Sequence, residues 1–238
     1  MMNKKFNQRQ KKIRDIEWNC IAEKIKNYKG NFCDVGAGTG YSMYKAQSLG
    51  FQIYGIEPSL NEHGVTDPGL KDIINHVQQG CAEQLPFADG FFQVVYASHS
   101  LEHFEDRHKG LSEMVRVLDE KGLAVIIVPT GIMAFISLIS QYLFSTHQRI
   151  GRFFFRKISL KNFRHIFLPD AHGLECKTVA GEISVFRVKK WEKLIENYFK
   201  IDQILLPCLY PYPDFPQIFP YISNGKVSSS VIFFCSKK

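Results

Sequence analysis

The sequence predicts an α/β fold, in which helices cover both faces of a mostly parallel sheet. Short apolar segments alternate with segments of helical periodicity along most of the 238 residues, which is typical of strand–helix–strand units. The segment "LAVIIVP" (123–129) is apolar on both faces, as expected of a central parallel strand. A glycine-rich turn directly follows the first apolar strand, at the sheet edge where open α/β folds bind ligands.

The first 130 residues supply most of this alternation. Apolar residues at helical spacing predict an N-terminal helix from Ile13 to Lys26. Gly50 is expected to end a helix over 41–49, and a further helix is predicted over 105–122. The strands expected in this half are 31–35, 51–58, 74–80, 91–100 and 123–129.

The alternation stops after Pro129. Residues 130–182 are expected to form an inserted lid or cap, with a helical apolar stretch over 132–144. The pattern then resumes with a helix over 186–199 and strands over 200–206 and 228–238, which brings the predicted strands to seven. We therefore predict a single domain over 1–238, with residues 1–29 as an N-terminal helical extension.

Composition excludes several classes of protein. Hydrophobic residues make up 45% and charged residues 22%, as in ordinary globular proteins. The six cysteines form no C-x-x-C pair, so we expect neither a metal site nor a redox dithiol, and we expect a cytoplasmic location. The net charge of +7 allows an anionic partner, but no nucleic-acid-binding motif accompanies it. Nucleic acid is therefore not the expected partner, and the oligomeric state stays open.

The glycine-rich turn lies in "NFCDVGAGTGY" (31–41). Tyr41 occupies the place of the third glycine of the dinucleotide fingerprint, and no Gly-Lys-Ser/Thr follows, so a P-loop is also excluded. Asp34 before the glycines suits a cationic ligand group better than a pyrophosphate. Glu57, at the end of the second strand, can accept hydrogen bonds from both hydroxyls of a ribose. A ribose, a close backbone and a cationic end together describe S-adenosylmethionine (SAM).

Four motifs extend this pattern in order: "CDVGAGTG", "IEPS", "GCAEQLPFADGFFQVVYASHSLEHFED" and "MVRVLDEKGLAVIIVP". Through them, residues 30–130 resemble class I SAM-dependent methyltransferases of the type-11 group. The resemblance implies a Rossmann-like three-layer sandwich with a lid insertion after strand five, SAM as cofactor and methyl transfer as the activity.

The resemblance also implies a set of cofactor-binding residues. The glycine loop would line the methionine and ribose, Glu57 would hold the ribose, and Ser98 would lie near the methyl group. These expected residues are Asp34, Gly36, Ala37, Gly38, Gly40, Glu57, Pro58, Cys81, Ala82, Glu83 and Ser98. Cys81 departs from the family pattern, in which an aspartate accepts from the adenine amino group. Because a thiol is a poor acceptor, adenine recognition is expected to rely on backbone contacts or to be weaker.

Transfer to a hydroxyl would be helped by a general base, for which histidine is the common choice near neutral pH. His172, in "PDAHG" within the inserted segment, is the preferred candidate, because this fold usually draws substrate-binding residues from that insertion. His99, after the fourth strand, is the second candidate, either lining the pocket or serving structure. His103 is expected to be structural.

The inserted segment bears on the acceptor. Its apolar stretch is shorter than the roughly 20 residues that span a bilayer, so lid or core packing is the favoured interpretation. Basic and aromatic residues follow it, and residues 132–164 could instead make a peripheral contact with an anionic inner-membrane surface. The predicted function is methyl transfer to a small-molecule, glycan or lipid-linked acceptor, at oxygen. The alternatives are an RNA or protein methyltransferase and a non-catalytic SAM-binding regulator, the latter favoured by Cys81.

Overall fold

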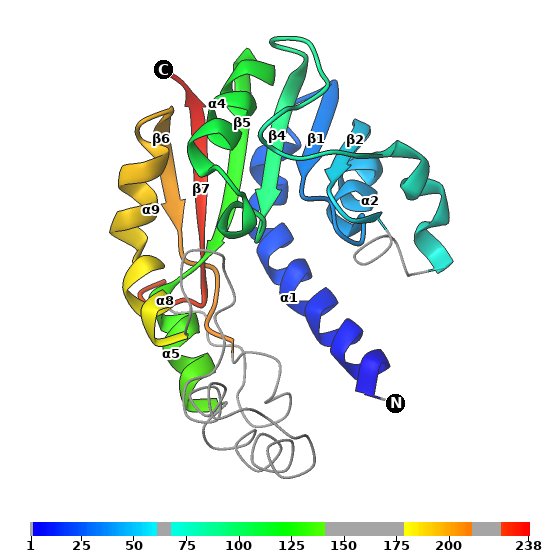
Figure 1. Cartoon of the computed structure of the whole chain (residues 1–238). Helices are drawn as coiled ribbons and strands as arrows, with labels where there is room; N and C mark the ends of the chain where they lie inside the picture. Colours follow the sequence, from blue (N-terminus) through cyan, green and yellow to red (C-terminus); the bar gives the residue numbers. More distant parts are fainter. Residues whose placement is uncertain (1, 61–67, 141–178, 211–224) are drawn as a thin grey trace, which may run out of the picture.

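The computed structural model describes residues 2–60, 68–140, 179–210 and 225–238, and these form one seven-stranded sheet (Figure 1). The strand order is β3-β2-β1-β4-β5-β7-β6. Strands β1 to β5 run parallel, whereas β7 is antiparallel to both of its neighbours, β5 and β6. The strands are β1 (Asn31–Val35), β2 (Gln52–Glu57), β3 (Val77–Gln79), β4 (Phe92–Ser98), β5 (Leu118–Pro129), β6 (Phe199–Leu205) and β7 (Ser230–Lys237).

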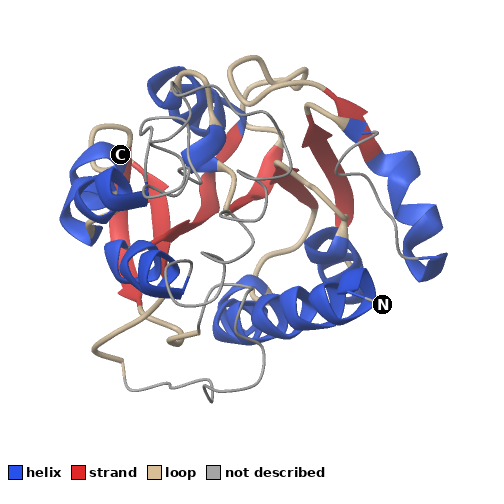
Figure 2. Cartoon of the chain, turned by 60° about the horizontal axis from the view of Figure 1, so that its bottom comes forward, coloured by secondary structure: helices blue, strands red, loops and turns tan. Residues whose placement is uncertain are grey.

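Helices cover both faces of this sheet (Figure 2). Trp18 of α1 and Met43 of α2 are buried against one face, and Met114 of α4 and Trp191 of α9 are buried against the other. The helices are α1 (Met2–Ile25), α2 (Tyr41–Ser48), η1 (Pro68–His76), η2 (Leu101–His103), α4 (Arg107–Val117), α5 (Gly131–Ser140), α8 (Val179–Val185) and α9 (Val188–Ile195). The predicted three-layer α/β sandwich with a mostly parallel seven-stranded sheet is confirmed.

Strand β5 shows why both faces must be covered. Val125 and Ile127 belong to the apolar cluster beneath α1 and α2, while Ala124, Ile126 and Val128 belong to the cluster beneath α4 and α9. Residues 123–129 of β5 are apolar at every position, and such a stretch is shielded from water only when layers cover both faces of the sheet.

Some predicted boundaries are wrong. The helix expected over 105–122 ends at Val117, because Leu118 already pairs with Phe92 of β4. The side chain of Asp119 then accepts a hydrogen bond from the backbone N–H of Lys121, which favours a turn over a further helical turn. The strand expected over 74–80 is confined to 77–79, after a 3-10 helix that periodicity did not indicate.

The N-terminal helix is longer than predicted, because α1 begins at Met2 and includes the basic run before Ile13. In the inserted segment, α5 confirms a helix at 131–140. A Cβ on Gly131 would lie 2.5 Å from the carbonyl oxygen of Ile183, so α5 and α8 pack closely. Residues 141–178, which include His172 and most of the expected lid, lie outside the described residues.

Candidate functional site

The glycine loop leaves β1 at Val35 and folds back against the ends of β2 and β4. The backbone N–H groups of Gly36 and Ala37 both donate to the carbonyl oxygen of Ile56, at N···O distances of 2.8 and 3.0 Å. Gly36 has a φ of 84°, and a Cβ there would lie 2.4 Å from the Cβ of Ser100. The hydroxyl of Ser100 in turn donates to the carbonyl oxygen of Val35 at 2.7 Å. Glycine is therefore required at position 36 for both its φ and its close contact.

Glu57 supports the next part of the loop. Its Oε2 accepts from the N–H of Gly38 at 2.9 Å, its Oε1 accepts from the N–H of Ser59 at 3.3 Å, and only 6% of the residue is exposed. A Cβ on Gly38 would meet no atom within 4 Å, so the loop faces open space at this point. Each carboxylate oxygen has two lone pairs, so Glu57 keeps acceptor capacity for the two hydroxyls of a ribose.

Asp34 lies at the end of β1, between Gly55 of β2 and Tyr96 of β4. Its carboxyl group is buried, and burial together with the negative charge of Glu57 raises its pKa well above the usual value, an effect that Arg14 opposes. A buried carboxyl group beside a second carboxylate lacks a full counter-charge. The residues present therefore fit a ligand that brings a ribose and a cationic group.

The segment expected at the adenine follows β3. The N–H of Gly80 donates to the carbonyl oxygen of Glu57 at 3.3 Å, which holds this segment beside the ribose-binding candidate. Cys81 is exposed and Ala82 is buried. The carboxylate of Glu83 accepts from the backbone N–H of Asp106 at 3.1 Å, immediately before α4. Glu83 thus fixes the loop through its side chain and leaves its backbone for any contact with a base.

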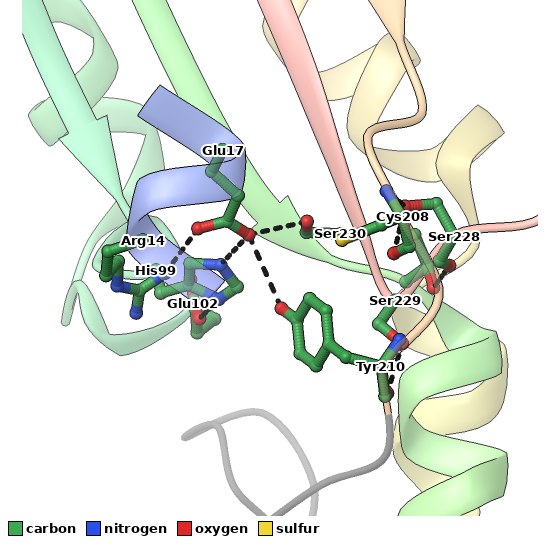
Figure 3. A network of polar contacts seen from close by, with 10 residues as sticks. Arg14, Glu17, His99, Glu102, Cys208, Tyr210, Ser228, Ser229 and Ser230 are labelled. Carbon is green, nitrogen blue, oxygen red and sulfur yellow. Dashed lines mark hydrogen bonds and ion pairs between the residues drawn. The ribbon is translucent and has the colours of Figure 1, made fainter. Parts of the chain in front are cut away.

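Figure 3 shows a polar junction that joins α1, the end of β4 and the start of β7. Its centre is Glu17 of α1. One carboxylate oxygen, Oε1, lies 3.0 Å from Nε2 of His99 and accepts from the hydroxyl of Ser230 at 2.6 Å; the other, Oε2, accepts from Nη1 of Arg14 at 2.7 Å. The phenol of Tyr210 donates to Oε1 at 3.4 Å. Elements distant in the sequence are therefore connected through one carboxylate.

The electrostatics of this junction favour an ionised Glu17. Burial alone would raise its pKa, but the charges of His99 and Arg14 and hydrogen bonds from His99 and Ser230 lower it to about 2. Burial and the charge of Glu17 raise the pKa of Tyr210 well above its usual value, so the phenol stays protonated as a donor.

His99 occupies a backbone conformation with a φ of 50°, the one positive φ among the non-glycine residues described. A left-handed conformation at a non-glycine residue costs free energy and persists where other contacts enforce it. Here the imidazole is enclosed by two carboxyl groups, since its Nδ1 also lies 3.8 Å from Oε1 of Glu102.

Two side chains beside His99 have buried oxygens without a hydrogen-bond partner in the described part of the chain. They are the hydroxyl of Ser98, which ends β4, and both carboxyl oxygens of Glu102 in η2. Buried polar groups in native proteins usually have a partner, so such atoms mark a place that a ligand or a further polar group can complete.

Comparison with known proteins identifies the domain. Residues 33–126 match the protein family described as "Methyltransferase domain". Residues 33–126 are therefore a methyltransferase domain. The matched residues run from β1 into β5, so they contain the glycine loop, Glu57 and Ser98, whereas α1 precedes the match. The cofactor of this methyltransferase domain is SAM.

Curated relatives of the methyltransferase domain match over part of their length. The chain is 40% identical over 101 residues to a probable chloroplastic tocopherol O-methyltransferase from Oryza sativa subsp. japonica, covering 40% of this chain and 27% of the relative. It is 34% identical over 122 residues to a demethylmenaquinone methyltransferase from Chlorobaculum parvum, covering 48% of this chain and 50% of the relative. The chain thus spans half or less of the length of these two relatives.

Among solved structures, the PH0226 protein from Pyrococcus horikoshii superposes with a TM-score of 0.61 at 16% identity. The superposition covers 98% of this chain and 93% of the other. At 16% identity, this structural similarity supports the fold alone.

The expected cofactor residues fall into two groups in the methyltransferase domain. Residues 34–40 and 57–58 gather at the adjacent carboxyl ends of β1 and β2, and Ser98 ends the neighbouring β4. The group at 81–83 follows β3 and is joined to Glu57 through Gly80. Of the two histidines proposed as bases, His99 contacts Glu17, and His172 lies outside the described residues.

Sequence reasoning missed Arg14, Glu17 and Tyr210, because no local motif marks them. One signal was present. Glu17 stands in a row of positions four apart with Ile13, Ile21 and Ile25, and this row is otherwise apolar. A carboxylate on the buried face of a helix needs partners elsewhere in the fold.

Proposed function

We propose that this protein transfers a methyl group from SAM to an oxygen atom of a small-molecule or lipid-linked acceptor. The observation that carries the proposal is the buried pair of Asp34 and Glu57 behind the glycine loop, which suits a ribose and a cationic group. The bound cofactor supplies an activated methyl group on a sulfonium. The protein's part is then to align the acceptor in a pocket shielded from water.

The exposed face of α5 supports an apolar acceptor. Ile132, Phe135 and Ile139 are spaced along one side of this helix and are 38%, 51% and 42% exposed. The two relatives named above are a tocopherol and a demethylmenaquinone methyltransferase, which fits the same class of acceptor. A peripheral contact of α5 with a membrane surface would present such an acceptor to the site. Among the described residues, no helix is long and apolar enough to cross a bilayer.

His172 remains our proposed general base, and its exchange for alanine should abolish turnover while leaving SAM binding unchanged. For His99 we propose a positioning role, because Glu17 already engages its Nε2. An O-directed transfer needs a group to accept the hydroxyl proton, which is the role proposed for His172. Full turnover by His172→Ala would exclude the base.

The first experiment measures cofactor binding by calorimetry with SAM, S-adenosylhomocysteine (SAH) and NAD. Binding of the first two at micromolar affinity, without binding of NAD, supports the proposal, and binding of NAD alone contradicts it. Radiolabelled SAM is then offered with phenolic and quinol lipids, lipid-linked sugars, sugar nucleotides, RNA and protein. Label transfer to RNA or protein, or SAM binding without any transfer, would favour the two alternative functions.

A second experiment tests the α5 surface. Cosedimentation with anionic liposomes should be lost in Phe135→Asp. Tyr44→Asp changes another exposed aromatic residue, 43% exposed on α2, and should bind as the wild type does. Equal sedimentation of all three proteins would argue against a membrane contact through α5.

A further inference from the structure

The N-terminal helix places a cation at the site, although it lies outside the matched family segment. We propose that Arg14 of α1 binds the carboxylate of the methionine part of SAM. This inference rests on the proposed function and adds a binding residue to it from the extension at residues 1–29.

The contacts of α1 fix where Arg14 lies. Its neighbour Asp15 accepts from the phenol of Tyr41 at 2.6 Å, and Tyr41 directly follows the last glycine of the loop. One turn later, the ring of Trp18 packs edge-on against Tyr96, with ring centroids 6.0 Å apart. Arg14 therefore lies on a turn of α1 that is held between the glycine loop and the middle strand β4. In Figure 1, α1 passes across the edge of the sheet toward which the β4 arrow points.

The side chain of Arg14 is partly accessible to a ligand. It is 31% exposed, although its Nη1 pairs with the fully buried Glu17. Its positive charge acts on the pKa of both Asp34 and Tyr96, which are partners in the sheet register between β1 and β4. The guanidinium is thus close to the strand ends that carry the cofactor-binding candidates.

The charge of the ligand requires such a residue. The methionine part of SAM carries a carboxylate, yet the described residues of this region already include the carboxyl groups of Asp34, Glu57, Glu102 of η2 and Glu17 of α1. A carboxylate entering this group would be repelled unless a cation met it. Arginine suits this contact, because its planar guanidinium can pair with two carboxylates at once through different nitrogens. The bond from Arg14 to Glu17 uses Nη1.

The competing interpretation is that Arg14 only neutralises Glu17. The two roles differ in one measurable respect. A structural role affects all ligands of the site alike, whereas a contact with the methionine carboxylate affects only ligands that contain it.

The experiment compares SAM with decarboxylated SAM, which keeps the sulfonium, the ribose and the amino group. Calorimetry is run on the wild type, Arg14→Met, Arg14→Lys and Lys12→Met, the last of which removes an exposed cation from the same helix. Arg14→Met should bind SAM about 10- to 100-fold more weakly, as expected for a charge-assisted pair, and bind decarboxylated SAM within about threefold of the wild type. Arg14→Lys should recover part of the loss, and Lys12→Met should bind both ligands as the wild type does.

Because the two ligands are compared within each variant, partial destabilisation by Arg14→Met does not affect the result. An equal loss for both ligands in Arg14→Met would overturn the inference and leave Arg14 with its structural role. Failure of the wild type to bind SAM would instead contradict the proposed function.

Discussion

At position 34, burial and a neighbouring carboxylate both oppose ionisation. The pKa of Asp34 is raised well above 3.8, first by burial and second by Glu57. The folded state therefore holds the carboxyl proton of Asp34 more tightly than the unfolded chain does. The stability contributed by the protonated form is complete below pH 3.8. It is lost as the pH rises through the raised pKa. The side chain therefore destabilises the unliganded protein near neutral pH and suits a cationic ligand.

Asp34→Asn should separate these two effects. Near neutral pH the free energy of unfolding of the unliganded variant should exceed that of the wild type by about 1 kcal/mol or more. The reason is that the substitution removes a buried carboxylate that lacks a full counter-charge. Its affinity for SAM should fall about tenfold or more. Thermal melts with and without SAM measure both quantities, and Asp72→Asn serves as a control at an exposed aspartate. An unliganded variant less stable than the wild type would contradict this account of position 34.

Glu17 has the opposite pH dependence. Its pKa is lowered from 4.5 to about 2, so its ionised form contributes stability that is present above pH 4.5 and is lost as the pH falls toward 2. This shift corresponds to about 3 kcal/mol. Glu17→Gln should remove that part of the acid sensitivity.

Urea unfolding of the wild type and Glu17→Gln at a series of pH values from 6 to 2 measures the difference. The two free-energy curves should converge as the pH falls below 4.5. Glu23→Gln, on an exposed stretch of the same helix, should run parallel to the wild type. Parallel curves for Glu17→Gln as well would show that Glu17 is not the stabilising group.

At the scale of elements, the glycine loop offers a matched pair of substitutions. Gly36→Ala should lower both stability and SAM affinity, since its Cβ would meet Ser100 at 2.4 Å and its φ is 84°. Gly38→Ala should cost only about 1 kcal/mol of stability, because its Cβ would enter open space at a φ of 50°. It should still weaken SAM binding by filling the ligand's place.

The two variants are distinguished by chemical unfolding and by SAH calorimetry. Gly50→Ala, another glycine with positive φ and no atom near its would-be Cβ, controls for the backbone effect away from the site. If Gly38→Ala bound SAH as Gly50→Ala does, the ligand would not lie against this loop.

The accuracy with which the sequence predicts each element depends on how far apart in the sequence the residues lie whose contacts determine its bounds. Strands β1, β2 and β4 were predicted within two residues, and β5 was predicted from residue 123 onward, because burial on both faces leaves a continuous apolar run. The end of α4 was predicted wrongly, because it depends on the pairing of Leu118 with Phe92 of β4. The junction at Glu17 was not predicted either, since its hydrogen bond to Ser230 spans 213 positions of the chain.

At the scale of the molecule, α1 is part of the core even though it precedes the family match. Trp18, Ile21 and Ile25 are buried against one face of the sheet. Trp18→Ala should lower the free energy of unfolding by about 3–5 kcal/mol, the usual cost of deleting a buried aromatic ring. Removal of residues 1–28 should expose this face and yield aggregated protein.

Urea unfolding measures the first effect, and size-exclusion chromatography of the truncated chain measures the second. Trp191→Ala is the matched change on the opposite face, where the ring is also buried. A monomeric, SAH-binding protein without residues 1–28 would show that α1 is dispensable, and would also remove the basis for a ligand contact by Arg14.

The place of β7 has a consequence for how the chain folds. It follows every other strand of the sheet in sequence, yet it lies between β5 and β6, and Ser230 at its start completes the partners of Glu17. While the chain is being synthesised, β5 and β6 therefore have no strand between them until β7 is made. Glu17 of α1 likewise lacks its hydrogen bond from Ser230 until that residue has been added. Contacts this distant slow folding and leave apolar edges exposed until they form. Nascent chains arrested before Ser230 should accordingly depend on chaperones, and acquire the SAM site only once β7 has left the ribosome.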